Sequence, residues 1–497
     1  MNFFKIVLTA ISIVSTLSLN VNAETLHVYG WPKSHLPSGK NPDFSLGSDP
    51  VVGALSCLPF SRLDLIKGSS LPVIFSQIHE KKSADGSIEW SFEISANTAL
   101  RWWSGETISS KPFVNFLQEN LAKIVAEKGL KLWNAPGFEI KAINDKKFSV
   151  VWQKQPTFGP YILNGVAPWR SAKSSFECVG TFSLEDGKNE LVLKNRFKKS
   201  SRSYDEIILH FASAPEKNEE KKNHWLKFEY AQDLSNDGKC LREVEIPMIT
   251  LVQWNNKRSE TGSAKFRQAM TQLLPRGEMF RVGGLKMGDL ISGLILRAHP
   301  GYNRKVLVRP FNAEKSNEEL AQIGYPRPNL LAPRLNAEGK PLRLSIWSPL
   351  TETKQANLIE KILVDSFAAS GIITQVLNDK KMPDKNSLDG AITGLVLDWP
   401  EQNYFLDMHS RVEDSALFWR PQDPELDKML ETYALSLTQQ KPNFSTLQNI
   451  HQRIYDLEPF SIIMQHSACI RVDDNFGKQL STVLMRDPEW FKKLIEI

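Results

Sequence analysis

Cysteine is scarce in this sequence, and its spacing argues against a metal or redox centre. The 497 residues include four cysteines, and no two of them form the C-x-x-C pair typical of zinc and thioredoxin-like sites. They are Cys57, Cys178, Cys240 and Cys469. In an oxidising compartment four cysteines permit three disulfide pairings, and the sequence leaves the pairing open. Cys57 lies in the apolar run 54–60, which also suits a buried free thiol.

The short motifs that mark common enzymes are also missing. The sequence contains no G-x-S-x-G elbow, no H-E-x-x-H pair, no P-loop and no G-x-G-x-x-G turn. Its nine histidines are scattered, and none pairs with another at the spacing of a helical metal site. We expect His409 and His466 to be structural or exposed. These absences favour a binding protein over an enzyme, and they predict no catalytic residue, no metal site and no cofactor.

A strong excess of charge of one sign is absent as well. The chain carries 61 basic and 56 acidic residues, a net charge of +5. That balance is too weak and too evenly spread to indicate nucleic acid or an anionic membrane as a partner. With 41% hydrophobic and 24% charged residues, the composition is that of an ordinary globular protein. At about 100–200 residues per domain, the length predicts two or three domains.

Long hydrophobic runs are missing after the first 23 residues. Those residues combine Lys5, an apolar core from Ile6 to Leu19, and the cleavage-like triplet Val21-Asn22-Ala23. No cysteine follows the core directly, and no later stretch reaches about 18 uninterrupted apolar residues. We therefore expect 1–23 to be a cleaved signal peptide without a lipid anchor. The mature protein is then expected to be exported, most simply to a bacterial periplasm.

The sequence does contain a regular alternation of strand-like and helical segments. Period-two patterns predict strands, and apolar residues at helical spacing predict helices. Strands are predicted at 25–29, 89–94, 140–152 (two, around a turn at 144–145), 191–195, 207–211, 249–254, 342–347, 372–377, 391–397 and 462–464. Helices are predicted at 113–128, from 266 onward, and at 318–323, 353–369, 423–437 and 444–457. The strand–helix–strand order across 342–377 predicts a parallel pair, and hence an α/β fold.

Three smaller predictions concern the segment that precedes the first long helix. Ser110, with Pro112 two residues later, is predicted to cap the amino terminus of that helix. Residues 158–163 are predicted to form a tight turn into a strand. Trp102 is expected in a core and Trp103 at the surface.

The strongest functional signal lies between Gly394 and Leu406. An apolar run ends at Leu397, and Asp398 follows it directly. Pro400 cannot donate to a sheet, so the strand should end there. A carboxylate beside apolar surface needs a cation or several N–H donors, because an unpaired buried charge is costly. A ligand ammonium group would meet that need, as would a local Lys or Arg or a capped turn.

Several motifs follow one another in an order that resembles a known family. They are Trp90 to Ser110, Phe158-Gly159-Pro160-Tyr161, Asn255 with Phe266-Arg267-Gln268-Ala269, Asn303, Gly324-Tyr325, the helix–Gly371–strand unit, Asp423-Pro424-Glu425-Leu426-Asp427, and Gly394-Leu395-x-x-Asp398-Trp399-Pro400-Glu401-Gln402. Their order over 25–470 resembles the family 5 extracellular solute-binding proteins, the receptors of peptide and nickel ABC importers. The chain departs from the family pattern at Leu395, where a Trp is usual, and at Gln402, where a Pro is usual. Where the family usually has an aromatic residue or His followed by Asp, this chain has Trp103 followed by Ser104.

The resemblance implies a two-lobed periplasmic-binding-protein fold of the large class, with mixed sheets flanked by helices and a ligand cleft between the lobes. We place lobe 1 at 24–253, with an extra subdomain at 59–174, and lobe 2 at 254–465. The chain then returns to lobe 1 over 466–497. Closure of the two lobes about a hinge would enclose the ligand.

The same resemblance implies a role for the residues around Asp398. In peptide-binding members of the family, the matching Asp holds the ligand's α-ammonium group. Trp399 matches the aromatic residue that follows it, and Glu401 matches a second acid. Tyr404 and Trp419 are further candidates for apolar walls, against the alternative of ordinary core packing. The expected protein is a monomer that binds a peptide-like ligand, delivers it to a membrane ABC permease and is not an enzyme.

Other functions remain open at this point. Within the same class, the ligand could be an oligosaccharide, a nickel chelate or haem. An exported hydrolase without a recognised motif is an alternative from a different class. A sensory or scaffold protein that kept the fold and lost transport is a third.

Overall fold

The structure is a computed structural model of the chain. It describes residues 25–29, 55–64, 69–95, 100–128, 132, 135–171, 176–186, 190–196, 204–210, 224–230, 242–282, 290–295, 297, 299–349, 354–379, 381–396, 408–412, 417–438 and 442–472. Within them, no helix combines the length and the apolar character needed to cross a membrane.

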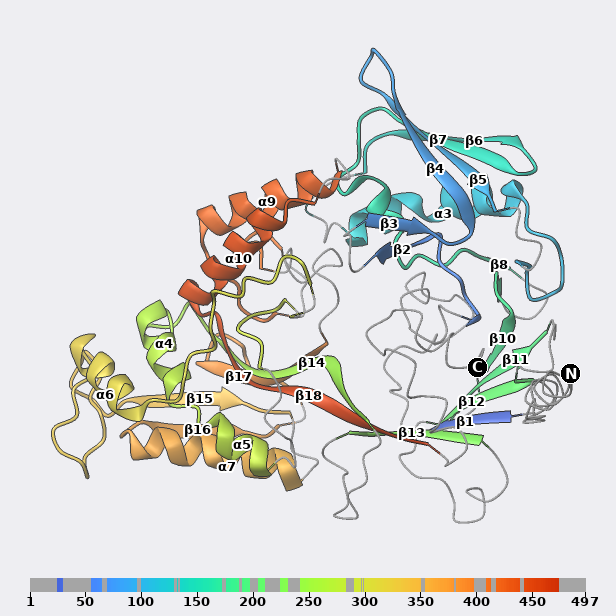
Figure 1. The fold of residues 1–497 in the computed structure, drawn as a ribbon. Helices are drawn as coiled ribbons and strands as arrows, with labels where there is room; N and C mark the ends of the chain where they lie inside the picture. Colours follow the sequence, from blue (N-terminus) through green and yellow to red (C-terminus); the bar gives the residue numbers. More distant parts are fainter. Residues whose placement is uncertain are drawn as a thin grey trace, which may run out of the picture.

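A mixed sheet of ten strands runs through the molecule (Figure 1). Its order is β10-β11-β12-β1-β13-β18-β14-β17-β15-β16. The strands are β1 (Thr25–Tyr29), β10 (Phe182–Asp186), β11 (Glu190–Asn195), β12 (Glu206–His210), β13 (His224–Tyr230), β14 (Arg242–Trp254), β15 (Arg343–Trp347), β16 (Ile373–Leu377), β17 (Gly390–Val396) and β18 (Phe460–Val472). The predicted strands at 249–254 and 462–464 are therefore the ends of much longer ones.

Strands β14 and β18 join the two halves of this sheet. Each has 13 residues, and they pair antiparallel with each other at the centre. Pro247 lies in β14, where it has no N–H to donate. The pairing with β18 is interrupted at the same place, with a shift of register between Glu245 and Ile249. The two halves are thus connected through strands whose ladder is broken in the middle.

One half of the sheet carries an α/β layer, seen on the left of Figure 1. Strands β15 and β16 are parallel and are linked by helix α7 (Lys354–Ala369), as the strand–helix–strand pattern predicted. Helices α4 (Ala264–Gln272), α5 (Arg276–Val282) and α6 (Ala313–Gln322) complete the layer. The predicted helix at 318–323 is in fact longer, because Asn312 caps it and accepts the N–H of Lys315 at 2.9 Å.

The opposite half of the main sheet contains strand β1, the first strand that the structure describes. Strand β1 lies between β12 and β13 and is parallel to both. Its apolar residues Leu26 and Val28 are fully buried, as are Ile207 and Leu209 on β12. On β12 the alternation seen in the sequence corresponds to one face turned into a core, whereas on β1 His27 and Tyr29 are buried as well.

A second sheet of four strands forms a separate layer at the top of Figure 1, next to helix α3 (Ser110–Lys128). Its strands, in the order β4-β5-β7-β6, are β4 (Phe75–Lys82), β5 (Ile88–Ile94), β6 (Phe138–Asn144) and β7 (Lys147–Trp152). Its core is aromatic: the rings of Phe92 and Phe148 stack with centroids 4.8 Å apart. The prediction that Trp102 lies in a core is confirmed, because the residue is fully buried against Phe113.

Ser110 was wrongly predicted as a helix cap. It is the first residue of α3, and its hydroxyl donates to the backbone oxygen of Asn144 at 2.6 Å. The hydroxyl therefore ties α3 to the turn between β6 and β7 instead of accepting a helix N–H. The helix starts three residues before the predicted position 113.

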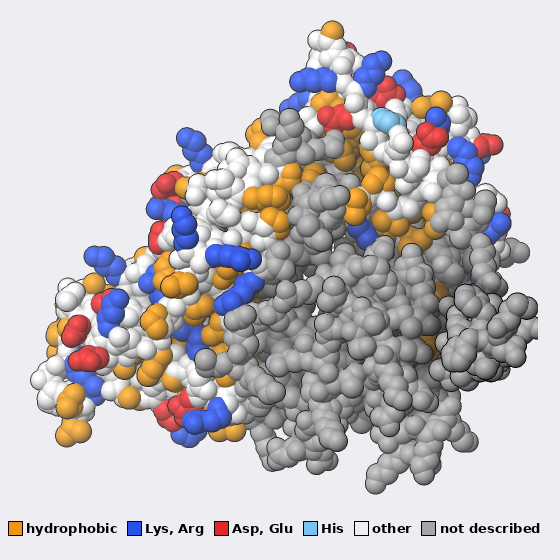
Figure 2. Space-filling view, viewed as in Figure 1, with side chains coloured by type: hydrophobic (Ala, Val, Ile, Leu, Met, Phe, Trp, Pro, Cys, Tyr) orange, Lys and Arg blue, Asp and Glu red, His pale blue; other side chains and the backbone are white. Residues whose placement is uncertain are grey.

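The face in Figure 2 shows basic and acidic side chains interspersed over most of the described surface. This agrees with the small net charge of the sequence. Helix α10 (Phe444–Leu457) carries Arg453, which pairs with Asp423 and Glu425.

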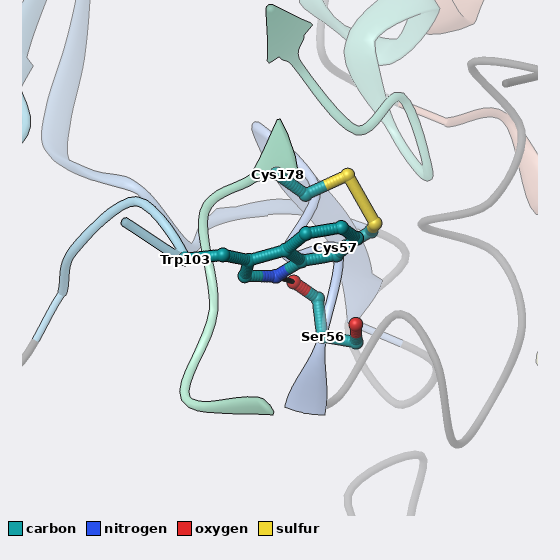
Figure 3. The surroundings of a disulfide bond; sticks show 4 residues. All are labelled: Ser56, Cys57, Trp103 and Cys178. Carbon is teal, nitrogen blue, oxygen red and sulfur yellow. Dashed lines mark hydrogen bonds between the residues drawn. A yellow bond between two sulfur atoms is a disulfide. The ribbon is translucent and has the colours of Figure 1, made fainter. Parts of the chain in front are cut away.

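A disulfide bond joins Cys57 to Cys178, which are 121 residues apart (Figure 3). Cys178 ends the short strand β9 (Phe176–Cys178), which pairs with β8 (Trp169–Ser171). Of the two alternatives left open for Cys57, a disulfide is therefore the one observed, and a free thiol is excluded. Trp103, expected at the surface, is half-buried instead: its indole N–H donates to the backbone oxygen of Ser56 at 2.9 Å, next to Cys57 (Figure 3).

Residues 159–163 form a short 3₁₀ helix, η3 (Gly159–Leu163), and not the predicted entry into a strand. Phe158, which precedes it, has a φ of 71°. Such a conformation costs a bulky residue about 1–3 kcal/mol, so surrounding contacts must hold it. Phe158 and the whole of η3 are buried, and η3 contacts helix α9 (Pro424–Thr438).

Candidate functional site

The candidate site follows strand β17, which lies between β14 and β15 in the main sheet. The strand pairs antiparallel with β14, from Gly390 opposite Trp254 to Val396 opposite Met248. The prediction of a strand that leads up to Asp398 is thus confirmed as far as Val396. The predicted ligand residues Asp398, Trp399, Glu401 and Tyr404 lie outside the described residues.

The start of β17 is fixed by a buried polar cluster. The carboxylate of Asp389 accepts the N–H of Ser345 at 2.8 Å and the Nε–H of Arg258 at 3.1 Å. Asn255 donates its backbone N–H to the oxygen of Asp389 at 2.9 Å and its side-chain amide to Leu388 at 2.8 Å. Burial raises the pKa of Asp389, while the hydrogen bonds from Ser345 and Arg258 act in the opposite direction. Asn255, the strand-end residue of the family pattern, therefore fixes where β17 begins.

Trp419 lies beside these first residues of β17. It is 5% exposed and packs with Trp347, Leu388 and Ala391 in a small apolar cluster. Its indole N–H is buried and makes no hydrogen bond to any of the residues that the structure describes. Between Ala391 and Val396 the strand rises by roughly 17 Å. A ligand that touched both Trp419 and the residues after Val396 would therefore have to be extended, and the wall role of Trp419 stays a prediction.

Residues 408–412, the next described segment after β17, are hydrogen-bonded to α9. Ser410 donates its backbone N–H to the Asp427 carboxylate at 2.9 Å, and its hydroxyl bonds to the same group. His409 is 1% exposed, accepts the N–H of Arg411 at 3.2 Å and lies 3.2 Å from Glu431. The prediction that His409 is structural is confirmed. Both ends of the candidate site, at 396 and 408, are therefore attached to well-packed elements.

Asp423, the start of the Asp-Pro-Glu-Leu-Asp motif, has a structural role at the beginning of α9. Its carboxylate accepts the N–H of Leu426 at 2.7 Å, as a helix cap does. The same carboxylate pairs with Arg453 of α10 at 2.7 Å, and this pairing and the cap hold the pKa of Asp423 below its usual value. The motif thus joins α9 to α10.

The Arg of the Phe-Arg-Gln-Ala segment is also structural. The Arg267 guanidinium is buried and donates to the backbone oxygens of Thr261 at 2.7 Å, Gly262 and Glu458 at 2.8 Å, and Leu457. Glu458 follows α10 with a φ of 45° and accepts from Arg309 at 2.7 Å. Burial lowers the pKa of Arg267 to about 10, so the group stays charged at neutral pH. The sequence did not predict this cluster of Arg267, Glu458 and Arg309, because Glu458 belongs to no recognisable motif.

The buried charged groups around the candidate site have structural roles in the described part of the chain. No group of three His, Cys, Asp or Glu side chains in the described ranges could hold a metal ion. The buried acids and bases in those ranges are engaged in caps and backbone clamps, as at Asp389, Asp423 and Arg267.

Comparison of sequences alone identified no relative: no family model and no curated protein matches the chain. The structure, in contrast, is similar to many solved ones. NikA from Brucella suis, in complex with Fe(III)-EDTA, has a TM-score of 0.69 at 13% identity, covering 90% of this chain and 95% of that one. The periplasmic oligopeptide-binding protein of an ABC transporter from Thermotoga maritima has a TM-score of 0.64 at 13% identity, covering 91% and 92%.

A third solved structure shows the same likeness. It is the oligopeptide-binding protein AppA from Bacillus subtilis in complex with a nonapeptide, with a TM-score of 0.58 at 15% identity, covering 89% of this chain and 94% of that one. At sequence identities of 13–15%, structural similarity establishes that the chains share a fold. The chain therefore has the α/β fold of the periplasmic binding proteins, and the predicted fold class is confirmed.

Proposed function

We propose that this protein is the periplasmic substrate-binding component of an ABC importer and that its ligand is a peptide or peptide-like molecule. One observation carries the proposal: about nine-tenths of the chain shares its fold with substrate-binding proteins of such transporters. The proteins of that set differ in ligand, since they include a nonapeptide complex and an Fe(III)-EDTA complex. The ligand must therefore be argued from this chain's own residues.

Asp398 is the residue from which we argue a peptide. It lies two positions after the last residue of β17, in the segment whose two flanks are held by β14 and α9. A carboxylate in a water-poor site forms a strong charge-assisted bond with an ammonium group. Trp399 and Tyr404 would supply apolar walls beside it, with Glu401 as a second acid. Strand edges in the cleft would bond the peptide backbone independently of its side chains.

The proposed lobes are 24–253 with 466–497, and 254–465, with 59–174 as the extra subdomain. Strands β14 and β18 support this division, because they connect the two halves of the main sheet and their pairing is interrupted between Glu245 and Ile249. The four-stranded sheet with α3 supports the extra subdomain. Hinge closure at β14 and β18 would enclose the ligand, and the closed form would dock on a membrane permease.

The first test is a thermal-shift screen with di- to pentapeptides on the mature protein and on Asp398→Asn. A ligand that binds only the folded state stabilises it by about 2.7 kcal/mol at 100 times its Kd. We expect peptides with a free amino terminus to raise the Tm of the wild type by several degrees. We expect N-acetylated peptides, and all peptides with Asp398→Asn, to have little effect.

Asp365→Asn is the matched control, because Asp365 is exposed on α7 and pairs with Lys361 on the same helix. This variant should respond to peptides as the wild type does. If no peptide raises the Tm while an oligosaccharide, haem or a nickel chelate does, the importer role stands and the Asp398 anchor is wrong. Chemical conversion of the bound ligand on incubation would instead indicate an exported hydrolase.

Export is a separate part of the proposal. Edman sequencing of the secreted protein should begin at Glu24, directly after the proposed signal peptide 1–23. A protein that keeps residues 1–23 and stays in the membrane fraction would contradict it.

A further inference from the structure

A small cavity of about 20 Å³ lies where helices α4, α5 and α10 meet the first residues of strand β18. Most of its lining is aliphatic or aromatic. The remaining lining residues are polar or charged: Thr271, Arg276, Ser292, Arg309 and Glu458. None of the residues proposed to bind a peptide takes part, so the cavity is separate from that site.

Arg276 is a buried cation of this cavity. It is 6% exposed and forms no ion pair with the residues that the structure describes. Its Nε–H donates to the backbone oxygen of Ile462 at 2.7 Å, and its Nη1 donates to that of Arg309 at 2.9 Å. A guanidinium has five N–H donors, so three remain after those two bonds. Neutral carbonyl oxygens also leave the full charge without a counterion, and a buried charge without one is costly.

Glu458 is the one acid that lines the cavity in the described part of the chain, and its carboxylate is already engaged. It accepts the Nε–H of Arg309 at 2.7 Å and the hydroxyl of Thr271 at 2.7 Å. Burial lowers the pKa of Arg276 to about 10, while the charge of Glu458 acts in the opposite direction. Arg276 therefore stays charged at neutral pH without a direct bond to this carboxylate.

The same carboxylate also serves Arg267, whose buried guanidinium feels the charge of Glu458 and donates to its backbone oxygen at 2.8 Å. Among the described residues of this cluster, three guanidinium groups thus stand against one carboxylate, a surplus of two positive charges. Such a surplus in a low-dielectric interior attracts an anion strongly.

The size of the cavity limits what the anion can be. About 20 Å³ exceeds the roughly 10–15 Å³ that one water molecule needs. It is far below the roughly 300–1,000 Å³ of pockets that bind organic ligands. Phosphates and carboxylate ligands are therefore too large, and a single monoatomic ion fits. Chloride is the common anion of that size.

We propose that this cavity binds one chloride ion, held by the remaining N–H groups of Arg276 and by the guanidinium of Arg309. The bound ion offsets part of the surplus charge and stabilises the packing of α10 and β18 against α4 and α5. The inference does not depend on the proposed peptide receptor, because it uses none of its ligand residues.

Anomalous scattering from crystals of the mature protein grown in bromide tests the proposal directly. Bromide replaces chloride and is identified by its own absorption edge. We expect a bromide peak in the cavity, within hydrogen-bond distance of the guanidinium of Arg276. Bromide at the surface only, with water in the cavity, would overturn the proposal. This measurement needs no variant, so it decides the question even if a change at Arg276 prevents folding.

NMR of the chlorine nucleus tests the same site in solution. We expect the wild type to broaden the chloride line, and added bromide to reverse the broadening by competition. Arg276→Gln should lose most of this broadening. The matched control is Arg304→Gln, because Arg304 is an exposed arginine elsewhere on the surface, and it should behave as the wild type does. Equal broadening by the wild type and Arg276→Gln, or an equal loss in both variants, would indicate general attraction by surface charge and contradict the proposal.

Discussion

His451, a single buried residue, links helix α10 to the loop before α6. Its Nδ1 accepts the N–H of Asn303, and its Nε2 lies 3.1 Å from the hydroxyl of Ser292, which itself donates to Val306 at 2.7 Å. Since Nδ1 is an acceptor, the proton of the neutral ring is on Nε2. Gly293 lies so close that a Cβ there would come within 2.8 Å of the imidazole. The site therefore fits the neutral ring closely.

This fit makes the stability of the protein depend on pH. Burial lowers the pKa of His451 from 6.5 to about 4, because the charged form loses its hydration. A folded-state pKa below the unfolded value means that the contribution is complete above about pH 6.5 and is lost as the pH falls toward 4. The expected loss of unfolding free energy is about 3 kcal/mol.

Urea unfolding at several pH values between 7 and 4 measures this loss. His451→Gln should be less stable than the wild type at pH 7 and should lose less stability between pH 6.5 and 4. His79→Gln is the control, because His79 is exposed on β4 and its replacement should leave the slope unchanged. An unchanged slope in His451→Gln would show that other groups cause the acid sensitivity.

At the scale of elements, the disulfide between Cys57 and Cys178 fastens the segment before β2 (Ser61–Asp64) to strand β9. The backbone N–H of Leu58 donates to Val179 at 2.9 Å, and that of Thr181 donates to Leu55 at 2.8 Å. Gly180 permits the contact, since a Cβ there would lie 2.1 Å from the backbone oxygen of Ser56. The disulfide and these backbone hydrogen bonds therefore hold the same two segments together.

Reduction of this disulfide should lower the stability of the protein strongly. The closed loop spans 121 residues, for which chain entropy predicts a contribution of up to about 5 kcal/mol. Guanidinium unfolding with and without dithiothreitol measures it. Cys57→Ala/Cys178→Ala should resemble the reduced wild type and should not respond to the reductant. A full response in that variant would assign the effect to another pair of cysteines.

At the scale of the whole molecule, two long strands connect the halves of one continuous sheet. The pairing of β14 with β18 holds on both sides of the interruption and is missing between Glu245 and Ile249. Across the predicted lobe boundary, η3 also contacts α9. A bend at the interruption would therefore change the packing of η3 against α9 without breaking either half.

This arrangement predicts a change of shape when ligand binds. Small-angle X-ray scattering should show a smaller radius of gyration for the wild type at saturating peptide than without it. Asp398→Asn at the same peptide concentration should keep the larger value, because it lacks the ammonium anchor. Identical radii in the wild type with and without a bound peptide would argue against hinge closure.

Much of the fold follows from local patterns. The alternation of apolar residues marked the strands at 25–29 and 207–211, and the helical spacing marked α7, α9 and α10 within a few residues. The strand before Asp398 could be predicted because its apolar run is continuous, as expected for a strand buried on both faces. The order of motifs was sufficient to predict the fold class.

Other features depend on partners far away in the sequence. The sequence showed four cysteines but not that Cys57 meets Cys178, since pairing depends on which segments the fold brings together. It gave Trp103 as a surface residue because nothing local reveals that its indole N–H meets the backbone oxygen of Ser56. Residues 158–163 read as the start of a strand, although the buried contact with α9 holds them as a 3₁₀ helix.

The sequence by itself determined many of the strands and helices, such as β1, β12 and α7, and it determined Asp398 as the candidate anchor, because both depend on the order of neighbouring residues. Only the tertiary structure decided that Arg267 clamps the turn after α10 and that the buried ring of His451 meets Asn303 and Ser292. Periodicity is a local property of the chain. Burial, electrostatic environment and enclosure depend on groups that are distant in sequence and adjacent only after folding.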